Sequence, residues 1–71
     1  MNPRKIKKIR ETLFPENDFF VAGKNDHLAR SREAAAKSIG YSGSTWTSWE
    51  NGVMKPSRRA VLLLEQLFRS R

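Results

Sequence analysis

Residues 31–52 read SREAAAKSIGYSGSTWTSWENG, and this stretch decides the fold because it contains two helix patterns separated by a tight turn. Ser31 is a good N-cap residue, the run REAAAKSI forms helix readily, and Gly40 stands where a helix ends in a left-handed conformation. Ser42 offers a second N-cap, and the next helix is expected to reach about Glu50 before an Asn-Gly pair breaks it. The sequence therefore predicts two short helices joined by a very short connection.

The second of these helices has two faces of different chemistry. Trp46 and Trp49 are three residues apart and are expected to point inward together with Tyr41. The opposite face carries short, neutral, hydrogen-bonding side chains: Ser44, Thr47, Ser48 and Asn51. Because serine and threonine cost up to ~0.7 kcal/mol each in helix propensity relative to alanine, a purely solvated helix gains nothing from them. Hydroxyls and amides can instead reach base edges in the major groove, and Gly43 in the first turn lets the backbone approach a phosphate or a thymine methyl group.

Composition points to the same class of partner. The chain has 71 residues, a formal net charge of +7 and a pI near 10.6, which attracts polyanions: nucleic acid first and an anionic membrane second. A core of this size normally supplies only ~3–5 kcal/mol of stability, so helix packing or a second subunit must contribute. There is no cysteine, which excludes disulfides and thiolate metal ligands and suits a reducing compartment.

Several other classes of protein are not expected. No apolar run approaches the ~20 residues of a membrane span, and the basic start lacks the apolar segment of a secretory signal, so we predict a cytoplasmic protein. His27 has no second histidine or nucleophile near it in the sequence and is predicted to have a surface or capping role. Without clustered carboxylates or a phosphate-binding glycine loop, we expect no catalytic residue, no metal, no cofactor and no enzyme activity.

The first helix is expected at residues 2–14, with Pro3 in its first turn. Its inward side is predicted to comprise Ile6, Ile9, Leu13 and Arg10. Its outer side carries Arg4, Lys5, Lys7 and Lys8. This basic side is either a solvated face or a phosphate contact, and the sequence leaves both readings open.

Two further segments contain apolar residues that need an explanation. Pro15 ends the first helix, and the trio Phe19, Phe20 and Val21 after it is expected to be buried as a helical turn or an extended piece. Ser57 caps a last helix at residues 57–69 with a wide apolar stripe. Its members are Ala60, Val61, Leu62, Leu63, Leu64, Leu67 and Phe68. The surplus suggests a partner subunit, and complete burial in so small a domain explains it comparably well.

Residues 32–51 resemble the helix-turn-helix of the Cro and phage-repressor class of transcriptional regulators, the XRE family. The matching residues are Ser31, Ala35, Ala36, Gly40, Tyr41, Ser42, Trp46, Trp49, Glu50 and Gly52, followed by Lys55 and Pro56. Ala36 suits the close crossing of the two helices. The resemblance covers residues 31–68 and implies an all-α bundle of four to five helices in one domain, 1–71. The helix-turn-helix would occupy about 31–52, and 57–69 would be a dimerisation or core helix.

The sequence departs from the family pattern in three places. Arg32 replaces the glutamine that usually opens the second helix and bridges to the recognition helix, which puts that bridge in doubt. Trp46 replaces a smaller aliphatic residue, so the core must make room for it. Residues 15–30 form a longer connection between the first two helices than the family has.

The resemblance also assigns roles to residues. The positions that face DNA would be Ser42, Gly43, Ser44, Thr47 and Ser48, with Ser44 and Ser48 as base readers. The residues that hold the DNA backbone would be Arg32, at the N-terminus of its helix, Asn51, Lys55 and Arg58. Glu50 matches a glutamate that pairs with a buried arginine of the first helix, for which Arg10 is the candidate; a plain surface glutamate is the alternative.

These observations predict a sequence-specific regulator that binds double-stranded DNA through helix 42–50 in the major groove. The resemblance implies a homodimer on a palindromic operator, a repressor typical of phages or mobile elements, and no small-molecule effector. One alternative is an antitoxin or protein-interaction adaptor in which Phe19, Phe20 and the last helix grip a partner and DNA binding is secondary. Another is an architectural or RNA-binding protein that uses charge alone.

Overall fold

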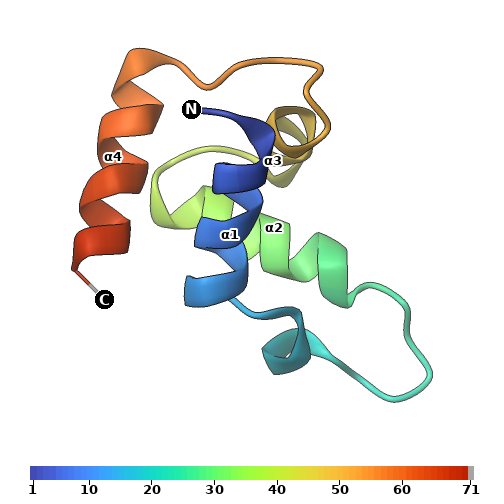
Figure 1. Ribbon diagram of the computed structural model, residues 1–71. Coiled ribbons are helices and arrows are strands. Elements are labelled where there is room, and N and C mark those ends of the chain that lie inside the picture. Colours follow the sequence, from blue (N-terminus) through green and yellow to red (C-terminus); the bar gives the residue numbers. More distant parts are fainter. Residues whose placement is uncertain (71) are drawn as a thin grey trace.

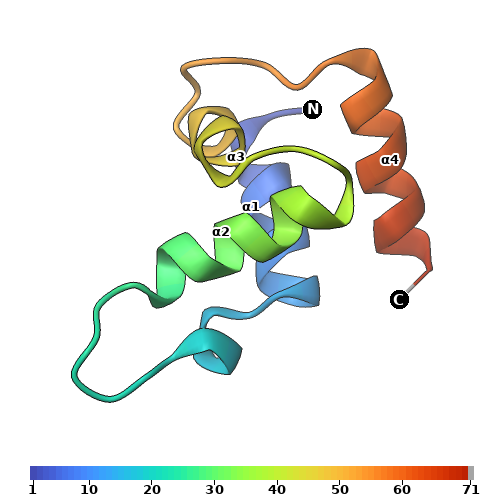
Figure 2. The same ribbon diagram turned by 180° about the vertical axis from the view of Figure 1, so that it is seen from behind.

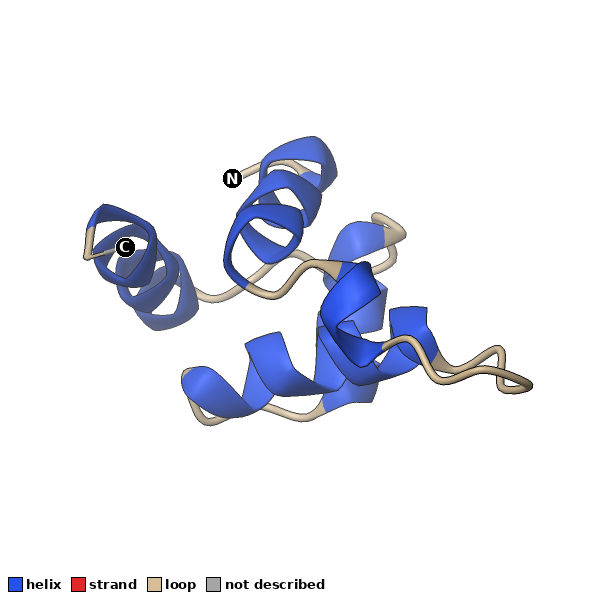
Figure 3. Ribbon diagram, turned by 90° about the horizontal axis from the view of Figure 1, so that it is seen from below, coloured by secondary structure: helices blue, strands red, loops and turns tan. Residues whose placement is uncertain are grey.

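The computed structural model describes residues 1–70, which form four α-helices and one turn of 3-10 helix, without any strand in that range (Figure 1; Figure 3). The elements are α1 (Pro3–Leu13), η1 (Glu16–Phe19), α2 (His27–Ser38), α3 (Gly43–Glu50) and α4 (Arg58–Arg69). The all-α prediction is confirmed. None of these helices combines the length and the apolar character that crossing a membrane requires.

Helix α1 begins where its sequence predicts. The side chain of Asn2 accepts a hydrogen bond from the backbone N–H of Lys5 at 2.8 Å, and Pro3 occupies the first turn, where a missing N–H costs nothing. Its inner face buries Ile6, Ile9 and Arg10 completely or nearly so. The outer residues remain exposed, so α1 is an amphipathic helix with a basic solvent side.

Helix α2 begins five residues earlier than the sequence suggested. It starts at His27 behind Asp26, so the prediction that Ser31 is the N-cap is wrong. The segment HLAR contains no helix breaker, and the helix therefore extends through it. Ser31 is fully buried instead: its Oγ donates to the carbonyl of Phe14 and accepts from Arg10 Nη1 at 3.0 Å. A predicted cap is thus a tertiary contact between α1 and α2.

The connection between α2 and α3 is as tight as predicted. Gly40 has φ of +84°, its N–H bonds the carbonyl of Lys37 at 3.1 Å, and the N–H of Tyr41 bonds that of Ala36 at 2.8 Å. This pair of bonds satisfies carbonyls at the end of α2 and reverses the chain, as the left-handed glycine allows. The Ser42 side chain then accepts from the N–H of Thr45 at 3.2 Å and caps α3, so both local predictions are confirmed.

The core lies where α1, α2, α3 and α4 meet. Trp46 and Trp49 are 0% and 2% exposed, their rings 5.6 Å apart, and Tyr41 packs edge-on against Trp49. Small residues line the rest of this region, with Ala35, Ala36 and Ala60 all fully buried, and Leu64 completes the cluster. These alanines leave the volume that the large indoles need. In both Figure 1 and Figure 2, α1 lies between α3 on one side and α4 on the other.

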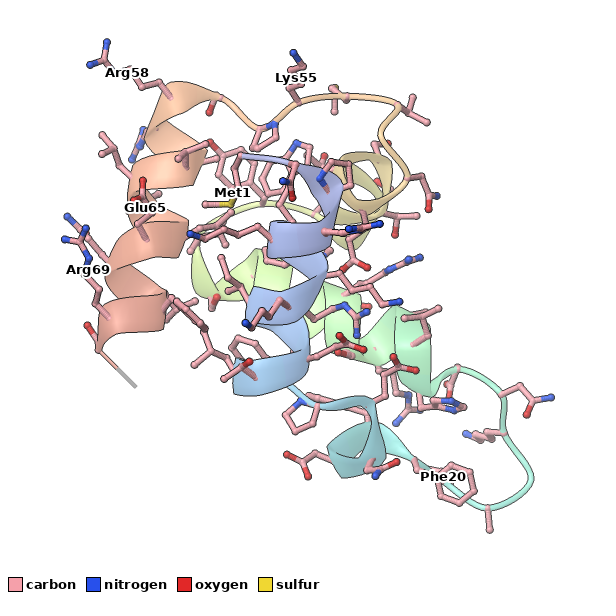
Figure 4. The ribbon with its side chains drawn as sticks, viewed as in Figure 1. Met1, Phe20, Lys55, Arg58, Glu65 and Arg69 are labelled. Atoms are coloured by element: carbon pink, nitrogen blue, oxygen red, sulfur yellow. The ribbon has the colours of Figure 1, made fainter. Side chains whose placement is uncertain are left out.

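Burial of the remaining apolar residues was predicted only in part. Phe19 is half-buried, but Phe20 and Val21 are 61% and 41% exposed, so the expectation that this trio is buried is wrong for two of its members. The chain leaves η1 in an extended conformation at Phe20, whose ring lies 5.8 Å from the ring of His27 and is otherwise exposed (Figure 4). On α4, Leu62 is 54% exposed, so one core does not account for the whole apolar stripe.

Candidate nucleic-acid interface

The outer face of α3 is open to solvent over its whole length. Ser42, Ser44 and Asn51 are exposed, while Thr47 and Ser48 are intermediate, and none of these side chains is buried. The face carries no charge and lies opposite the two buried indoles. The predicted division of this helix into an apolar inner side and a polar outer side is confirmed.

The hydroxyls on this face are arranged to accept hydrogen bonds. Thr47 Oγ1 donates to the carbonyl of Gly43 at 2.9 Å, and Ser48 Oγ donates to that of Ser44 at 3.2 Å. Because each hydroxyl uses its proton within the helix, its lone pairs face solvent as acceptors. Ser44 Oγ lies 3.2 Å from Ser42 Oγ, and either can be the donor. The face can therefore accept from exocyclic amino groups of bases, and rotation of a hydroxyl lets it donate instead.

Gly43 is explained first by packing between helices. A Cβ at this position would lie 3.3 Å from both Cα and Cβ of Glu33 on α2, which is tighter than ordinary van der Waals contact. The glycine allows the start of α3 to lie directly on α2. Its expected role in approaching a phosphate is separate from this packing role, and Gly43 itself is half-buried.

Glu50 holds α3 in place from the inner side. Its side chain is 2% exposed and accepts two hydrogen bonds from Arg10, Nε to Oε2 at 2.6 Å and Nη2 to Oε1 at 3.1 Å. The expected pairing of Glu50 with Arg10 is confirmed. Trp46 Nε1 donates to Oε2 at 2.5 Å, and Arg32 Nη2 lies 3.3 Å from Oε1. One carboxylate thus connects α1, α2 and α3.

The two charged groups stabilise each other's ionised forms. Burial alone raises the pKa of Glu50, but hydrogen bonds from Arg10 and Trp46 and the charges of Arg10 and Arg32 outweigh it and hold the pKa below its ordinary value. Burial alone lowers the pKa of Arg10, and its bonds to Glu50 and Glu16 reverse this and raise it. The site is therefore a paired, ionised cluster at neutral pH.

This cluster predicts a loss of stability in acid. Because the pKa of Glu50 is lower in the folded chain than in the unfolded one, its contribution is complete above the ordinary carboxyl range. It disappears as the pH falls from about 4.3 through the lowered folded value. Urea midpoints measured from about pH 6 to pH 2 are expected to show this decrease, and the double variant Arg10→Met with Glu50→Gln, which leaves no charge of the pair buried alone, should show a smaller one. Equal decreases in both proteins would contradict the assignment.

Arg32 lies elsewhere than expected. It was predicted at the N-terminus of its helix, in position to hold a phosphate, but α2 begins at His27 and Arg32 is in its middle. Its side chain is 18% exposed and ion-paired with Glu50, and its Nε is buried without a hydrogen-bond partner. Arg32 therefore connects α2 to α3 through its ion pair with Glu50. The glutamine that is usual at this position in the family was expected to make such a bridge, and the arginine makes one in its place.

The remaining predicted contacts follow α3 in the chain, in the loop after it and at the start of α4. Asn51, Lys55 and Arg58 are all exposed, and Lys55 and Arg58 point away from the body of the protein at the same end (Figure 4). Asn51 and Lys55 thus follow the end of α3 directly in the chain, whereas Arg58 lies on α4, apart from the hydroxyl face (Figure 4). None of Asn51, Lys55 and Arg58 is drawn into the core.

Sequence reasoning missed two exposed apolar residues in the loop after α3. Val53 and Met54 are 79% and 47% exposed, and their N–H groups both bond the carbonyl of Ser48, at 3.0 and 3.3 Å. The loop after α3 therefore folds back on the helix end and exposes two apolar side chains there, of which Met54 lines a hollow together with Pro3 and Trp49. Two apolar residues in a short polar loop were the available signal.

Neither metal ligands nor similarity to known proteins identifies the function of the outer face of α3. Within residues 1–70, no group of three or more histidine, aspartate or glutamate side chains is placed to hold a metal ion. No family model, curated protein or solved structure matches the chain. The geometry of α3 and its surroundings is therefore what supports an assignment of function.

Proposed function

We propose that the chain is a sequence-specific transcriptional regulator that binds double-stranded DNA with α3 in the major groove. The observation that carries this proposal is the contrast between the two faces of α3. Its inner side is anchored by two buried indoles and a buried carboxylate, whereas its outer side is neutral, solvent-facing and lined with hydroxyls. A helix fits the major groove, and hydroxyl and amide groups can pair with base edges there.

The surroundings of α3 support this use. The chain carries +7 overall, which favours association with a polyanion, while α3 itself brings no carboxylate to its outer face. Asn51 and Lys55 follow α3 directly in the chain and would hold phosphates without reading sequence. Arg58, at the start of α4, would hold a phosphate farther from α3 (Figure 4). The resemblance of residues 32–51 to the helix-turn-helix of XRE-family regulators agrees with this arrangement.

We further propose that the protein acts as a homodimer on a palindromic operator. In that arrangement the half-sites lie about one helical turn, ~34 Å, apart. Leu62 on α4, which is 54% exposed, supplies apolar surface that a second copy can cover. Occlusion of a promoter by such a dimer needs no effector domain, so repression is the simplest outcome.

Replacing Ser44 and Ser48 with alanine tests the proposed readout. Base readers determine which sequence binds, so the double variant is expected to change the preferred operator, with discrimination reduced by roughly 1–3 kcal/mol at each affected base pair. Lys55→Ala is the matched control and should lower the affinity for all sequences about equally. Competition titrations with a panel of operator variants measure both effects. An unchanged preference in the double variant would favour recognition by charge alone.

A second candidate function is protein interaction, as in an antitoxin or an adaptor. The exposed side chains of Phe20 and Val21, which are neighbours in the chain after η1, favour it, because exposed apolar groups can mark contact sites. Fluorophenylalanine at position 20 tests this by 19F NMR in the DNA-bound protein. A solvent isotope shift would show that the ring is still free for another protein. A ring buried in the complex would count against this candidate.

A further inference from the structure

The basic outer side of α1 carries charges that the proposed function does not use. Arg4, Lys5, Lys7 and Lys8 are all exposed, and none of them belongs to an ion pair with a carboxylate within the described chain. No acidic residue occurs before Glu11. Four neighbouring cations without a counter-charge repel one another, and an anionic ligand would remove that repulsion.

Three of these cations line a hollow. A groove of about 340 Å³ lies between α1 and α4, which run side by side in Figure 1 and Figure 2. Its walls are Asn2, Arg4, Lys5, Lys8, Ile9 and Phe68. No acidic side chain is among these residues. The cations and the Asn2 amide supply donors, and Ile9 and Phe68 supply an apolar wall that keeps water from part of the site.

The groove opens on a different side of the molecule from the hydroxyl face of α3. Helix α1 turns its inner side toward α3, where Arg10 binds Glu50 and Pro3 lies against the backbone at Gly52. The cations of the groove are on the other side of α1, next to α4. The hydroxyl face of α3 in turn points away from α1. A straight duplex on α3 therefore leaves the groove free.

We propose that this groove is a second binding site, which takes the phosphate backbone of a nucleic-acid segment other than the one on α3. Arg4 can bind a phosphate through two parallel N–H donors, whereas Lys5 and Lys8 act as point charges on neighbouring phosphates. The donors meet phosphates and not bases, so this contact is independent of sequence. One protein molecule then binds two nucleic-acid segments at once, or two parts of one bent nucleic acid. The site does not require α3 to bind DNA.

The first test compares two triple variants of equal net charge. The groove variant is Arg4→Gln, Lys5→Gln and Lys8→Gln, and the control, made at exposed cations elsewhere, is Lys24→Gln, Arg59→Gln and Arg69→Gln. Affinity for a random-sequence duplex is measured by anisotropy as salt is varied. The slope of log K against log salt is expected to fall by about 2–3 in the groove variant and by less than about 1 in the control. Equal decreases would overturn the proposal, because they would reflect net charge alone.

The second test locates the site and its ligand. Tripolyphosphate is expected to shift the backbone NMR signals of residues 2–9 and of Phe68, and oligothymidylate should shift the same signals and displace it. Shifts spread over the whole protein would contradict a built site. Vesicles containing phosphatidylglycerol serve as the competitor, and preferential binding to them at equal phosphate would overturn the nucleic-acid assignment.

The two proposals can fail separately. Ser44→Glu with Ser48→Glu disables the hydroxyl face of α3 and leaves the groove intact. If this variant loses operator preference but keeps tripolyphosphate binding, both proposals stand. If it leaves duplex binding unchanged while the groove variant weakens it, the α3 readout fails and the groove site stands. If the groove variant behaves as its control does, the groove site fails irrespective of α3.

Discussion

Replacing Glu50 with glutamine is expected to lower the free energy of unfolding by about 3–5 kcal/mol, because it leaves the Arg10 guanidinium buried with little compensation. Arg10 is fully buried, and its remaining acceptors are Glu16 at 3.3 Å and the hydroxyl of Ser31. A domain of this size has only ~3–5 kcal/mol in total, so most of the variant should be unfolded at 37 °C. Urea unfolding followed by fluorescence measures it directly, since Trp46 and Trp49 are buried in the fold.

Two further variants establish that the pairing is the cause. Glu33→Gln is the charge-matched control, because Glu33 forms an exposed pair with Lys37 and its loss should change stability little. Combining Arg10→Met with Glu50→Gln removes both charges. The amide oxygen of the new glutamine side chain can still accept the hydrogen bond from the indole N–H of Trp46. The double variant should therefore be less destabilised than the sum of the single ones. Additive losses would show that Arg10 and Glu50 act independently.

DNA affinity is expected to fall by ~10³-fold or more between 50 and 200 mM salt, if a dimer makes about six to ten phosphate contacts. Cations that can supply such contacts are exposed: Lys55 in the loop after α3 and Arg58 at the start of α4 both project from the body of the protein (Figure 4). Anisotropy titrations with a labelled duplex at several salt concentrations give the slope. A flat dependence would contradict the entire nucleic-acid assignment.

Single substitutions show how much each residue contributes to the slope of log affinity against log salt concentration. Lys55→Gln is expected to reduce it by about 1 and to leave sequence preference unchanged, because a phosphate contact releases a counterion. Ser48→Ala is the matched control, since a neutral base reader releases none, and its slope should equal that of the wild type. A change in slope for Ser48→Ala would show that α3 lies differently on the duplex from the arrangement proposed.

Local chain chemistry was sufficient to predict the helix boundaries around α3. The cap at Ser42, the left-handed turn at Gly40 and the cap at Ser57 each involve residues within a few positions of one another. Such interactions form wherever the local sequence allows them, so they can be read without a structure. The outer face of α3 followed from the same reasoning, because helical spacing determines which side chains share a side.

The errors arose where distant parts of the chain decide the outcome. Ser31 is suitable for an N-cap, but its hydroxyl bonds Phe14 and Arg10, which no local pattern reveals. Arg32 was placed at a helix end, and the extra turn of α2 puts it within reach of Glu50 instead. Phe20 was expected to be buried because it is apolar, and only the path of the chain after η1 shows that its ring is exposed. The Arg10–Glu50 pair came from the family resemblance, since forty positions separate the two residues.

Selection of bound duplexes from a random pool, with the stoichiometry of the complex measured alongside, tests most directly whether α3 reads base sequence. We expect convergence on an inverted repeat bound by two copies of the chain, with half-site centres about 10 base pairs apart. A pool that remains random after repeated rounds, while still being retained, would mean that the hydroxyl face of α3 does not recognise bases.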